Sequence, residues 1–312
     1  MVHIRRFVQS TDEPVWVDVL NAASRDDEYW RAITVDEFLS LQKRLSFDPD
    51  GRFIAELDGR PIGVAHANVD KFRTDGKGDI RLDLIPEFRG REVAQQLMAT
   101  ALEELKARGM TTAQTWTDSA REDNVRLFQE FGFERVRVFS LMGMELDDMR
   151  QGIRENEEVT IRPLRLDVED DIILFDRLDN ETFKEHFNYR PNVLEETRAY
   201  LLSSPYLRQR EFFFAMLKEE AVGTVGVGID ESYNREKNAR IGEIITIGVL
   251  KPYRGEGVAT RLILHALENL KGKGMTRALI GVDDYNPTKA KGLYEKVGFR
   301  VRRKEFTYQR DL

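Results

Sequence analysis

Residues Glu243 to Ala259, EIITIGVLKPYRGEGVA, combine a strand pattern, a glycine-bearing loop and the start of a helix pattern in immediate succession. The run from Ile244 to Val249 is apolar and rich in β-branched residues, which is typical of a buried strand. Pro252 ends this strand because proline cannot donate to a sheet. An amphipathic helix pattern follows from Ala259 onward. Such a loop aims free backbone N–H groups and the positive end of a helix at one point, which predicts a seat for a pyrophosphate.

Two common phosphate-binding motifs do not fit this loop. The dinucleotide fingerprint G-x-G-x-x-G needs a third glycine where the chain has Thr260, and the Gly-Lys-Ser/Thr ending of a P-loop is missing. The loop instead reads Arg-x-x-Gly-x-Ala, at Arg254, Gly257 and Ala259. A second segment, NPTKAKGLYEKVGF, follows at residues 286–299. In this order and spacing the two segments resemble the signatures of the GNAT superfamily of N-acyltransferases, and a plain strand–turn–helix is the alternative.

The composition is that of an ordinary globular protein. The 312 residues are 41% hydrophobic and 33% charged, and the net charge of −7 argues against a broad nucleic-acid surface. There is no cysteine, and the four histidines show no metal-ligand spacing, so neither disulfides nor a metal are expected. Without a ~20-residue apolar span or a signal-peptide core, the expectation is a cytoplasmic protein that has no membrane contact. No pattern indicates an oligomeric state.

The chain contains one pattern twice. Residues 87–94, EFRGREVA, are similar to residues 252–259, PYRGEGVA, and LFQEFGF at 127–133 is similar to LYEKVGF at 293–299. We therefore expect two tandem GNAT-like domains, residues 1–146 and 159–312, joined by a polar linker over 147–158. Each is expected to have an α/β (mixed α+β) fold, with a central mixed, mostly antiparallel sheet flanked by helices and closed by its own last strand.

The two copies differ in their chemistry. At the motif positions the residues of the first and second copies are, in pairs, Glu92 and Gly257, Phe128 and Tyr294, Ala120 and Asn286, and, counting back from the loop arginine, Gly78 and Glu243. A carboxylate at position 92 opposes a pyrophosphate, and a phenylalanine has no proton to give. The first copy is therefore predicted to be degenerate and inactive, although Asp79 stands next to Gly78.

The tandem arrangement with a degenerate first half is similar to the mycothiol synthase family. The segments GEIITIGV at 242–249 and NETFKEHF at 180–187 carry this resemblance, the latter on the acceptor side. It implies acetyl-CoA as co-substrate, with the backbone N–H of Val249 binding the oxyanion. The cofactor-binding residues expected around the loop are Val249, Arg254, Gly255, Glu256, Gly257, Val258, Ala259 and Asn286.

Roles inside this set differ. Gly255 and Gly257 permit close approach of the backbone to phosphate. Arg254 is a candidate for either a structural or a phosphate contact. Glu256 is expected to point to solvent and to act through helix-start electrostatics. Asn286 is expected to cap the helix at Pro287–Lys296, and it is a candidate to touch the pantetheine arm.

Two residues are candidates for proton transfer. Strand alternation over residues 243, 245, 247 and 249 places Glu243 on the face of Val249, where it is the candidate general base, directly or through a water. Its alternative is an exposed strand-end glutamate. Tyr294 is the candidate general acid for the departing thiolate, and its alternative is a packing aromatic. The first copy keeps the ring as Phe128 and loses only the hydroxyl.

The predicted function is acetyl-CoA-dependent N-acetyl transfer to a primary amine of a small-molecule acceptor by direct attack in a ternary complex. The alternatives are an acyl-CoA-binding sensor without turnover, or an acetyltransferase acting on protein N-termini or aminoglycoside-like amines. The residues that choose the acceptor are expected in the 178–206 region, with His186 either lining that pocket or packing. The adjacent carboxylates Asp283 and Asp284 are read as polar loop rather than as a metal site.

Overall fold

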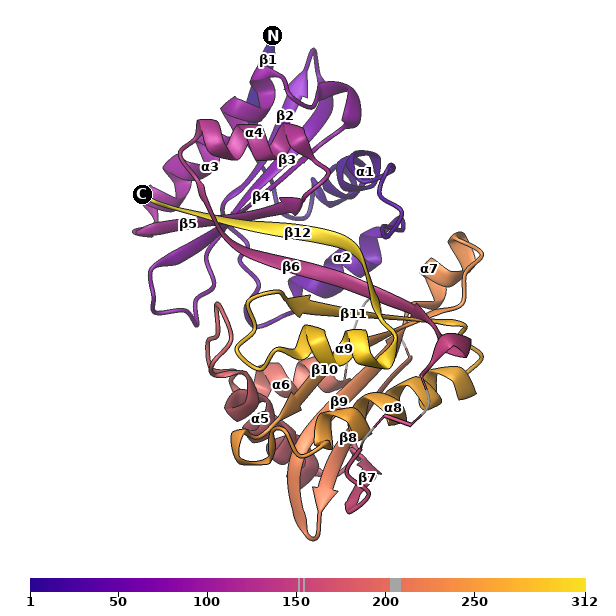
Figure 1. The fold of residues 1–312 in the computed structure, drawn as a ribbon. Coiled ribbons are helices and arrows are strands. Elements are labelled where there is room, and N and C mark those ends of the chain that lie inside the picture. Colours follow the sequence, from indigo (N-terminus) through magenta and orange to yellow (C-terminus); the bar gives the residue numbers. More distant parts are fainter. Residues whose placement is uncertain (151, 154, 203–208) are drawn as a thin grey trace. The chain divides into compact units, whose positions relative to one another are not determined.

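The computed structural model describes residues 1–150, 152–153, 155–202 and 209–312 (Figure 1). Two compact units divide the chain, residues 1–138 with 305–312 as the first and residues 139–304 as the second. Each unit contains six strands, and all neighbouring pairs within a unit are antiparallel except β4–β5 and β10–β11. The predicted mixed, mostly antiparallel sheet with flanking helices is therefore confirmed in both units.

The first unit has the strand order β1-β2-β3-β4-β5-β12. Helix α3 packs across it, and a core cluster of this unit contains Leu97, Leu105 and Phe128, all almost fully buried. The elements up to the unit boundary are β1 (Val2–Arg6), α1 (Glu13–Ala23), α2 (Val35–Gln42), β2 (Arg52–Leu57), β3 (Arg60–Asn68), β4 (Lys77–Leu84), η1 (Pro86–Phe88), α3 (Glu92–Ala107), β5 (Thr112–Asp118), α4 (Glu122–Glu130) and β6 (Glu134–Glu145).

The second unit has the strand order β6-β11-β10-β9-β8-β7. Its sheet is covered on both faces, because one apolar cluster includes residues of α8 and α9 and another includes residues of α5 and α6. The remaining elements are η2 (Leu146–Asp148), β7 (Val159–Pro163), α5 (Glu169–Phe183), α6 (Leu194–Leu202), β8 (Gln209–Leu217), β9 (Glu220–Ile229), α7 (Glu231–Glu236), β10 (Ile241–Val249), η3 (Lys251–Tyr253), α8 (Val258–Gly272), β11 (Arg277–Asp283), α9 (Ala290–Val297) and β12 (Arg300–Asp311).

The last strands of the two sequence copies are exchanged. Residues 305–311 of β12 pair with β5 in the first unit, and residues 139–145 of β6 pair with β11 in the second. The expectation that each copy is closed by its own last strand is wrong. Both strands follow the same Gly-Phe pattern and both are long, so either one satisfies the hydrogen bonds of either neighbour. The boundaries at residues 146 and 159 describe the two copies of the sequence repeat, and the two compact units have other boundaries.

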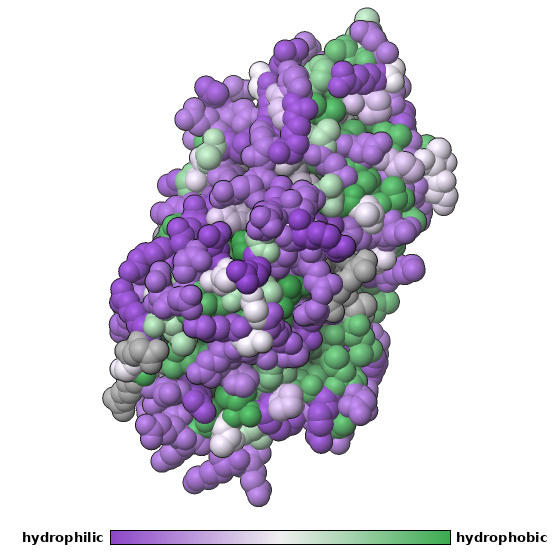
Figure 2. Space-filling model, turned by 90° about the vertical axis from the view of Figure 1, so that its right-hand side faces the viewer, coloured by the Kyte–Doolittle hydropathy of each residue, from purple (hydrophilic) through white to green (hydrophobic). Residues whose placement is uncertain are grey.

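Polar side chains dominate the face shown in Figure 2, as expected for a chain of which one third is charged. Among the described residues, no helix is both long and apolar enough to cross a membrane.

Candidate active site

The central strand β10 contains an irregularity that sets which side chains face which way. Ile244 pairs with Val227 and Thr246 with Gly226, so Ile245 is an extra residue without a partner on β9. Such a bulge shifts the alternation of side chains by one position. Glu243 therefore shares its face with Thr246 and Gly248 rather than with Val249.

Neighbouring helices confirm these two faces. An ideal Cβ on Gly248 would lie 2.4 Å from Oγ1 of Thr182, so this face of β10 looks toward α5. Gly223, which pairs with Val249, has its ideal Cβ position 3.2 Å from Leu262 of α8. The expectation that Glu243 and Val249 share a face is wrong, because strict alternation ignores the bulge.

The end of β10 offers backbone groups that its neighbours do not use. The N–H of Leu250 donates to Val222 O at 2.9 Å, so in this antiparallel pair the N–H of Val249 points the other way, toward β11. Pairing between β10 and β11 covers only the first part of β10 and ends at Ile244 and Ile280. The Val249 N–H is thus directed into the opening where the two parallel strands separate.

The carboxylate of Glu243 makes no polar contact with the described part of the structure. It is half-buried on β10, and it makes no hydrogen bond or ion pair with any residue that the structure describes. Burial raises its pKa, and the nearby Asp230 carboxylate raises it further. A carboxylate in this state is suited to accept a proton, because a higher pKa makes it a stronger base.

Tyr294 lies on α9 with only 5% of its surface exposed. Its ring packs in the apolar cluster of α8 and α9, with its centroid 6.2 Å from that of Phe299. The hydroxyl makes no hydrogen bond to the described part of the chain, and burial raises its pKa above the ordinary value. The hydroxyl therefore stays protonated and remains available as a donor.

The loop before α8 holds a run of free amides. The N–H groups of Tyr253 and Arg254 are used inside the turn, donating to Leu250 O and Lys251 O. From Gly255 to Ala259, no backbone N–H has an acceptor among the residues described. Gly255 and Gly257 have φ of 84° and 80°, a left-handed conformation that favours glycine. The run of free N–H groups in this loop therefore begins at Gly255, after Arg254.

Arg254 serves the structure of this loop. Its guanidinium donates to Val249 O at 3.0 Å, to Thr182 O at 3.3 Å and to Glu185 Oε2 at 2.6 Å. These contacts tie the end of β10 to the end of α5. Glu185 also accepts from Lys251, and the two cations lower its pKa to about 2. The sequence left either a structural or a phosphate contact open for Arg254. In this conformation Arg254 makes structural contacts.

Glu256 is exposed, as expected, whereas the expected role of Asn286 as a helix cap is wrong. Helix α9 begins at Ala290 after Lys289, and Asn286 Oδ1 instead accepts from Thr288 N at 2.8 Å. The motif Asn-Pro therefore forms a separate turn ahead of the helix, because a side chain at 286 cannot reach the first turn of a helix that starts four residues later.

Asp284 belongs to a polar network. It accepts from Ser140 Oγ at 2.7 Å and pairs with Lys291 Nζ at 2.8 Å, joining the exchanged strand β6 to the first turn of α9. Nowhere in the described ranges do three or more metal-ligating side chains gather.

A protein-family model described as acetyltransferase (GNAT) family matches residues 16–133 and 175–299. The chain belongs to the GNAT acetyltransferase family. Its two matches correspond to the two copies of the sequence repeat, which confirms the tandem arrangement.

Curated relatives carry one name. A mycothiol acetyltransferase of Thermomonospora curvata is 30% identical over 138 residues, which are 44% of this chain and 46% of that protein. The chain thus aligns with about half the length of the first relatives that it matches. A mycothiol acetyltransferase of Salinispora arenicola is 26% identical over 305 residues, covering 96% of this chain and 94% of that one. A solved tandem GNAT protein from the clavulanic acid biosynthesis pathway shares the fold, with a TM-score of 0.73 at 13% identity over 100% of this chain and 98% of its own.

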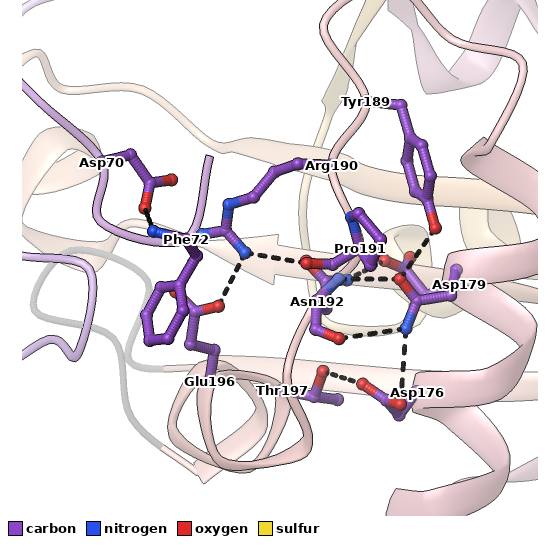
Figure 3. A network of polar contacts seen from close by, with 11 residues as sticks. Asp70, Phe72, Asp176, Asp179, Tyr189, Arg190, Pro191, Asn192, Glu196 and Thr197 are labelled. Carbon is purple, nitrogen blue, oxygen red and sulfur yellow. Dashed lines mark hydrogen bonds and ion pairs between the residues drawn. The ribbon is translucent and has the colours of Figure 1, made fainter. Parts of the chain in front are cut away.

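Sequence reasoning missed a second polar network of this GNAT chain, on the α5 side (Figure 3). Asn180 Oδ1 accepts from Tyr189 OH at 3.1 Å and from Asn192 N at 2.8 Å, and Asn192 Nδ2 donates to Asp179 Oδ2 at 2.8 Å. Burial raises the pKa of Asp179 to about 6. These contacts hold the chain after α5 in place. The available signal was a run of polar residues at 176, 179 and 180 within a helix that packs on a sheet.

His186 lies in this same segment. Its ring contacts that of Phe183 with centroids 4.6 Å apart, and burial lowers its pKa while Asp283 opposes this. The side chain therefore lies within electrostatic reach of the end of β11. Residues 203–206 of the expected acceptor region lie outside the described residues.

Proposed function

We propose that this GNAT protein transfers an acetyl group from acetyl-CoA to a primary amine of a small-molecule acceptor, by direct attack in a ternary complex formed in the second unit. The observation that carries the proposal is the unpaired Glu243 carboxylate on the same strand whose far end presents the free Val249 N–H. Neither group has a hydrogen-bond partner among the residues that the structure describes.

The residues around the opening of β10 and β11 fit acetyl-CoA. The free N–H groups from Gly255 to Ala259 and the start of α8 suit a diphosphate, which needs several donors and a positive potential. The Nδ2 of Asn286 has no partner among described residues and is free for an amide of the pantetheine arm. When bound, acetyl-CoA supplies the activated acetyl group, whose carbonyl oxygen Val249 N–H would polarise.

Glu243 would remove the proton that the attacking amine must lose. An ordinary lysine-like amine has a pKa of about 10.4, so it arrives charged and needs a base to become nucleophilic. The raised pKa of Glu243 brings the carboxylate closer to this value. The transfer runs directly or through one water molecule.

Tyr294 would act as a hydrogen-bond donor to the departing sulfur. A free thiol has a pKa of about 8.5 and an ordinary tyrosine about 10, so full transfer of the tyrosine proton to a thiolate is uphill by about 2 kcal/mol. Burial raises the pKa of Tyr294 further and widens this gap. Its contribution is therefore to stabilise, by a hydrogen bond, the negative charge that develops on sulfur. The thiolate would then take up a proton that the amine has released.

The relatives are named mycothiol acetyltransferase, which makes a mycothiol-related amine the first acceptor to test. The assay follows free CoA thiol with acetyl-CoA and a panel of amines. For Glu243→Gln we expect kcat to fall by about 10²- to 10⁴-fold, the usual contribution of a general base, with CoA binding retained. Glu219→Gln is the matched control, because Glu219 is an exposed carboxylate at the turn between β8 and β9.

Two results would contradict the proposal. An unchanged rate in Glu243→Gln would remove the assigned base. Tight CoA binding by the folded protein without turnover of any amine in the panel would favour a sensor over an enzyme.

A further inference from the structure

Arg261 on α8 is held by a residue of the segment that joins the two sequence copies. Its Nη1 lies 3.0 Å from Oε2 of Glu155, and both side chains are partly exposed. Arg261 follows Gly257 by four residues, so it lies one helical turn after the free amides of the loop. Its Nε is buried and has no hydrogen-bond partner in the described structure.

The backbone around Glu155 rests against the same loop. An ideal Cβ on Gly257 would lie 2.9 Å from Asn156 N and 3.0 Å from the carbonyl carbon of Glu155. Gly257 also has φ of 80°. A side chain at this position is therefore excluded twice, by backbone conformation and by the close approach of residues 155 and 156.

This approach is fixed by the start of the next strand. The carbonyl of Asn156 accepts from Val159 N at 3.2 Å, and its Oδ1 accepts from Glu158 N at 3.1 Å. Val159 is 1% exposed and begins β7. Glu155 thus leads directly into a tight turn that is anchored in the core of the second unit.

Glu155 and a bound diphosphate would compete for the guanidinium of Arg261. Both are anions near the N-terminus of α8, which favours negative charge, and both suit the fork of an arginine. A guanidinium whose Nη1 donates to Glu155 and whose Nε is buried keeps fewer of its five N–H donors for a phosphate. We propose that Arg261 is a phosphate-binding residue of the acetyl-CoA seat and that Glu155 holds it in the ligand-free protein, an inference that rests on the proposed function.

The first copy has no counterpart of the ion pair between Arg261 and Glu155. Gln96 stands seven residues after Arg89, as Arg261 does after Arg254, and it donates to Glu92 Oε1 at 3.0 Å. There the acidic partner belongs to the helix itself and the position carries no positive charge. The charged Arg261 and its acidic partner from the joining segment occur in the second copy, in which the acetyl-CoA seat is proposed.

The test is a double-mutant cycle on the full chain, with the dissociation constant of CoA measured calorimetrically. Glu155→Ala should bind CoA about two- to fivefold more tightly, because an exposed ion pair no longer has to break. Arg261→Ala should bind about tenfold more weakly. In the Arg261→Ala background, Glu155→Ala should have no further effect, because its partner is gone.

Glu157→Ala is the charge-matched control, since Glu157 is exposed and its side chain makes no hydrogen bond or ion pair with the described residues. The inference is overturned if Glu155→Ala fails to tighten binding, if the tightening persists without Arg261, or if Glu157→Ala tightens binding as much. Absence of CoA binding by the folded wild-type protein at millimolar concentration would be a different result, because it would refute the proposed cofactor seat itself.

Discussion

The two units keep the same framework contacts and differ in the groups that chemistry needs. Arg89 in the first unit donates to Leu84 O, Ala23 O and Asp26, just as Arg254 donates to Val249 O, Thr182 O and Glu185. Each arginine therefore ties the strand end to the helix that follows the first strand. What both copies share in the loop motif is a structural clamp.

The differences gather around the carboxylate of the central strand. By strand register Asp79, and not Gly78, is the counterpart of Glu243, because Asp79 pairs with Gln114 as Glu243 pairs with Leu279. Counting from the loop arginine gave Gly78, and this alignment is wrong by one residue because β10 has a bulge that β4 lacks. Asp79 accepts from Gln114 Nε2 at 3.1 Å, whereas the Glu243 carboxylate makes no hydrogen bond to the described part of the chain. Both units therefore keep a carboxylate at this position, and the described contacts differ in that Asp79 accepts a side-chain hydrogen bond.

The largest effect should come from separating the copies at the sequence repeat. A fragment of residues 159–312 lacks β6, which pairs with β11 and contributes Met142 and Met144, both at most 2% exposed, to the core. Losing buried side chains of this size costs about 2–5 kcal/mol each, and the edge of β11 is left unpaired. We expect no cooperative unfolding transition and no CoA binding for this fragment. Adding residues 1–158 should restore both.

Circular dichroism melts and calorimetry check this expectation. A fragment of residues 159–312 that folds alone and binds CoA like the full chain would show that the exchanged strand is dispensable.

The next effect concerns the ring that both copies bury. Tyr294→Phe should lower kcat by about 10²-fold or more while leaving stability nearly unchanged, because only the unpaired hydroxyl is lost. Phe128, 1% exposed, is its counterpart in the first unit. Phe128→Tyr should destabilise the protein by about 1–3 kcal/mol, since it buries a hydroxyl in an apolar cluster. Steady-state kinetics and denaturation of both variants give the answer, and equal rates for Tyr294→Phe and wild type would make the tyrosine a packing residue.

The repeat, the mixed sheet and the buried rings could be predicted from the sequence because they depend on local pattern. The strand exchange could not, since partner choice between β5 and β11 is decided by long-range pairing that two similar strands satisfy equally well. The face of Glu243 could not be predicted, because it depends on one extra residue, Ile245, and the sequence around it gives no sign of a bulge. The contact of Glu155 with Arg261 was equally invisible, because it joins residues 106 positions apart. The roles of Glu243 and Tyr294 stay predictions.

The stability of the first unit should depend on pH through His66, which has no titratable counterpart in the second unit. The side chain of His66 on β3 is 15% exposed, and its Nε2 is buried without a hydrogen bond to any described group. It lies beside Asp48, Arg52 and Arg108. Burial and then the Arg52 charge lower its pKa from 6.5 to about 3. The corresponding position in the second unit is Gly226, which does not titrate.

The sign follows from which state binds the proton. Below pH 6.5 the unfolded chain protonates this histidine while the folded unit does not, so stability falls as pH drops toward 3, by about 1.4 kcal/mol per pH unit. All three tryptophans (Trp16, Trp30 and Trp116) lie in the first unit, so their fluorescence reports its unfolding alone. Denaturation at pH 7 and pH 5 should show a loss of about 2 kcal/mol that His66→Gln removes. An equal loss in that variant would place the titration elsewhere.

The smallest effect tests the shared clamp and resolves the role of Arg254. Both Arg89→Ala and Arg254→Ala should lower stability by about 1 kcal/mol, because the lost contacts are partly exposed. Only Arg254→Ala should raise the KM for acetyl-CoA, since the free amides after it lose their anchor to α5, and kcat should change little. If Arg254→Ala instead weakens CoA binding with no loss of stability while Arg89→Ala destabilises, the second arginine binds phosphate directly and the likeness of the two clamps is confined to the ligand-free protein.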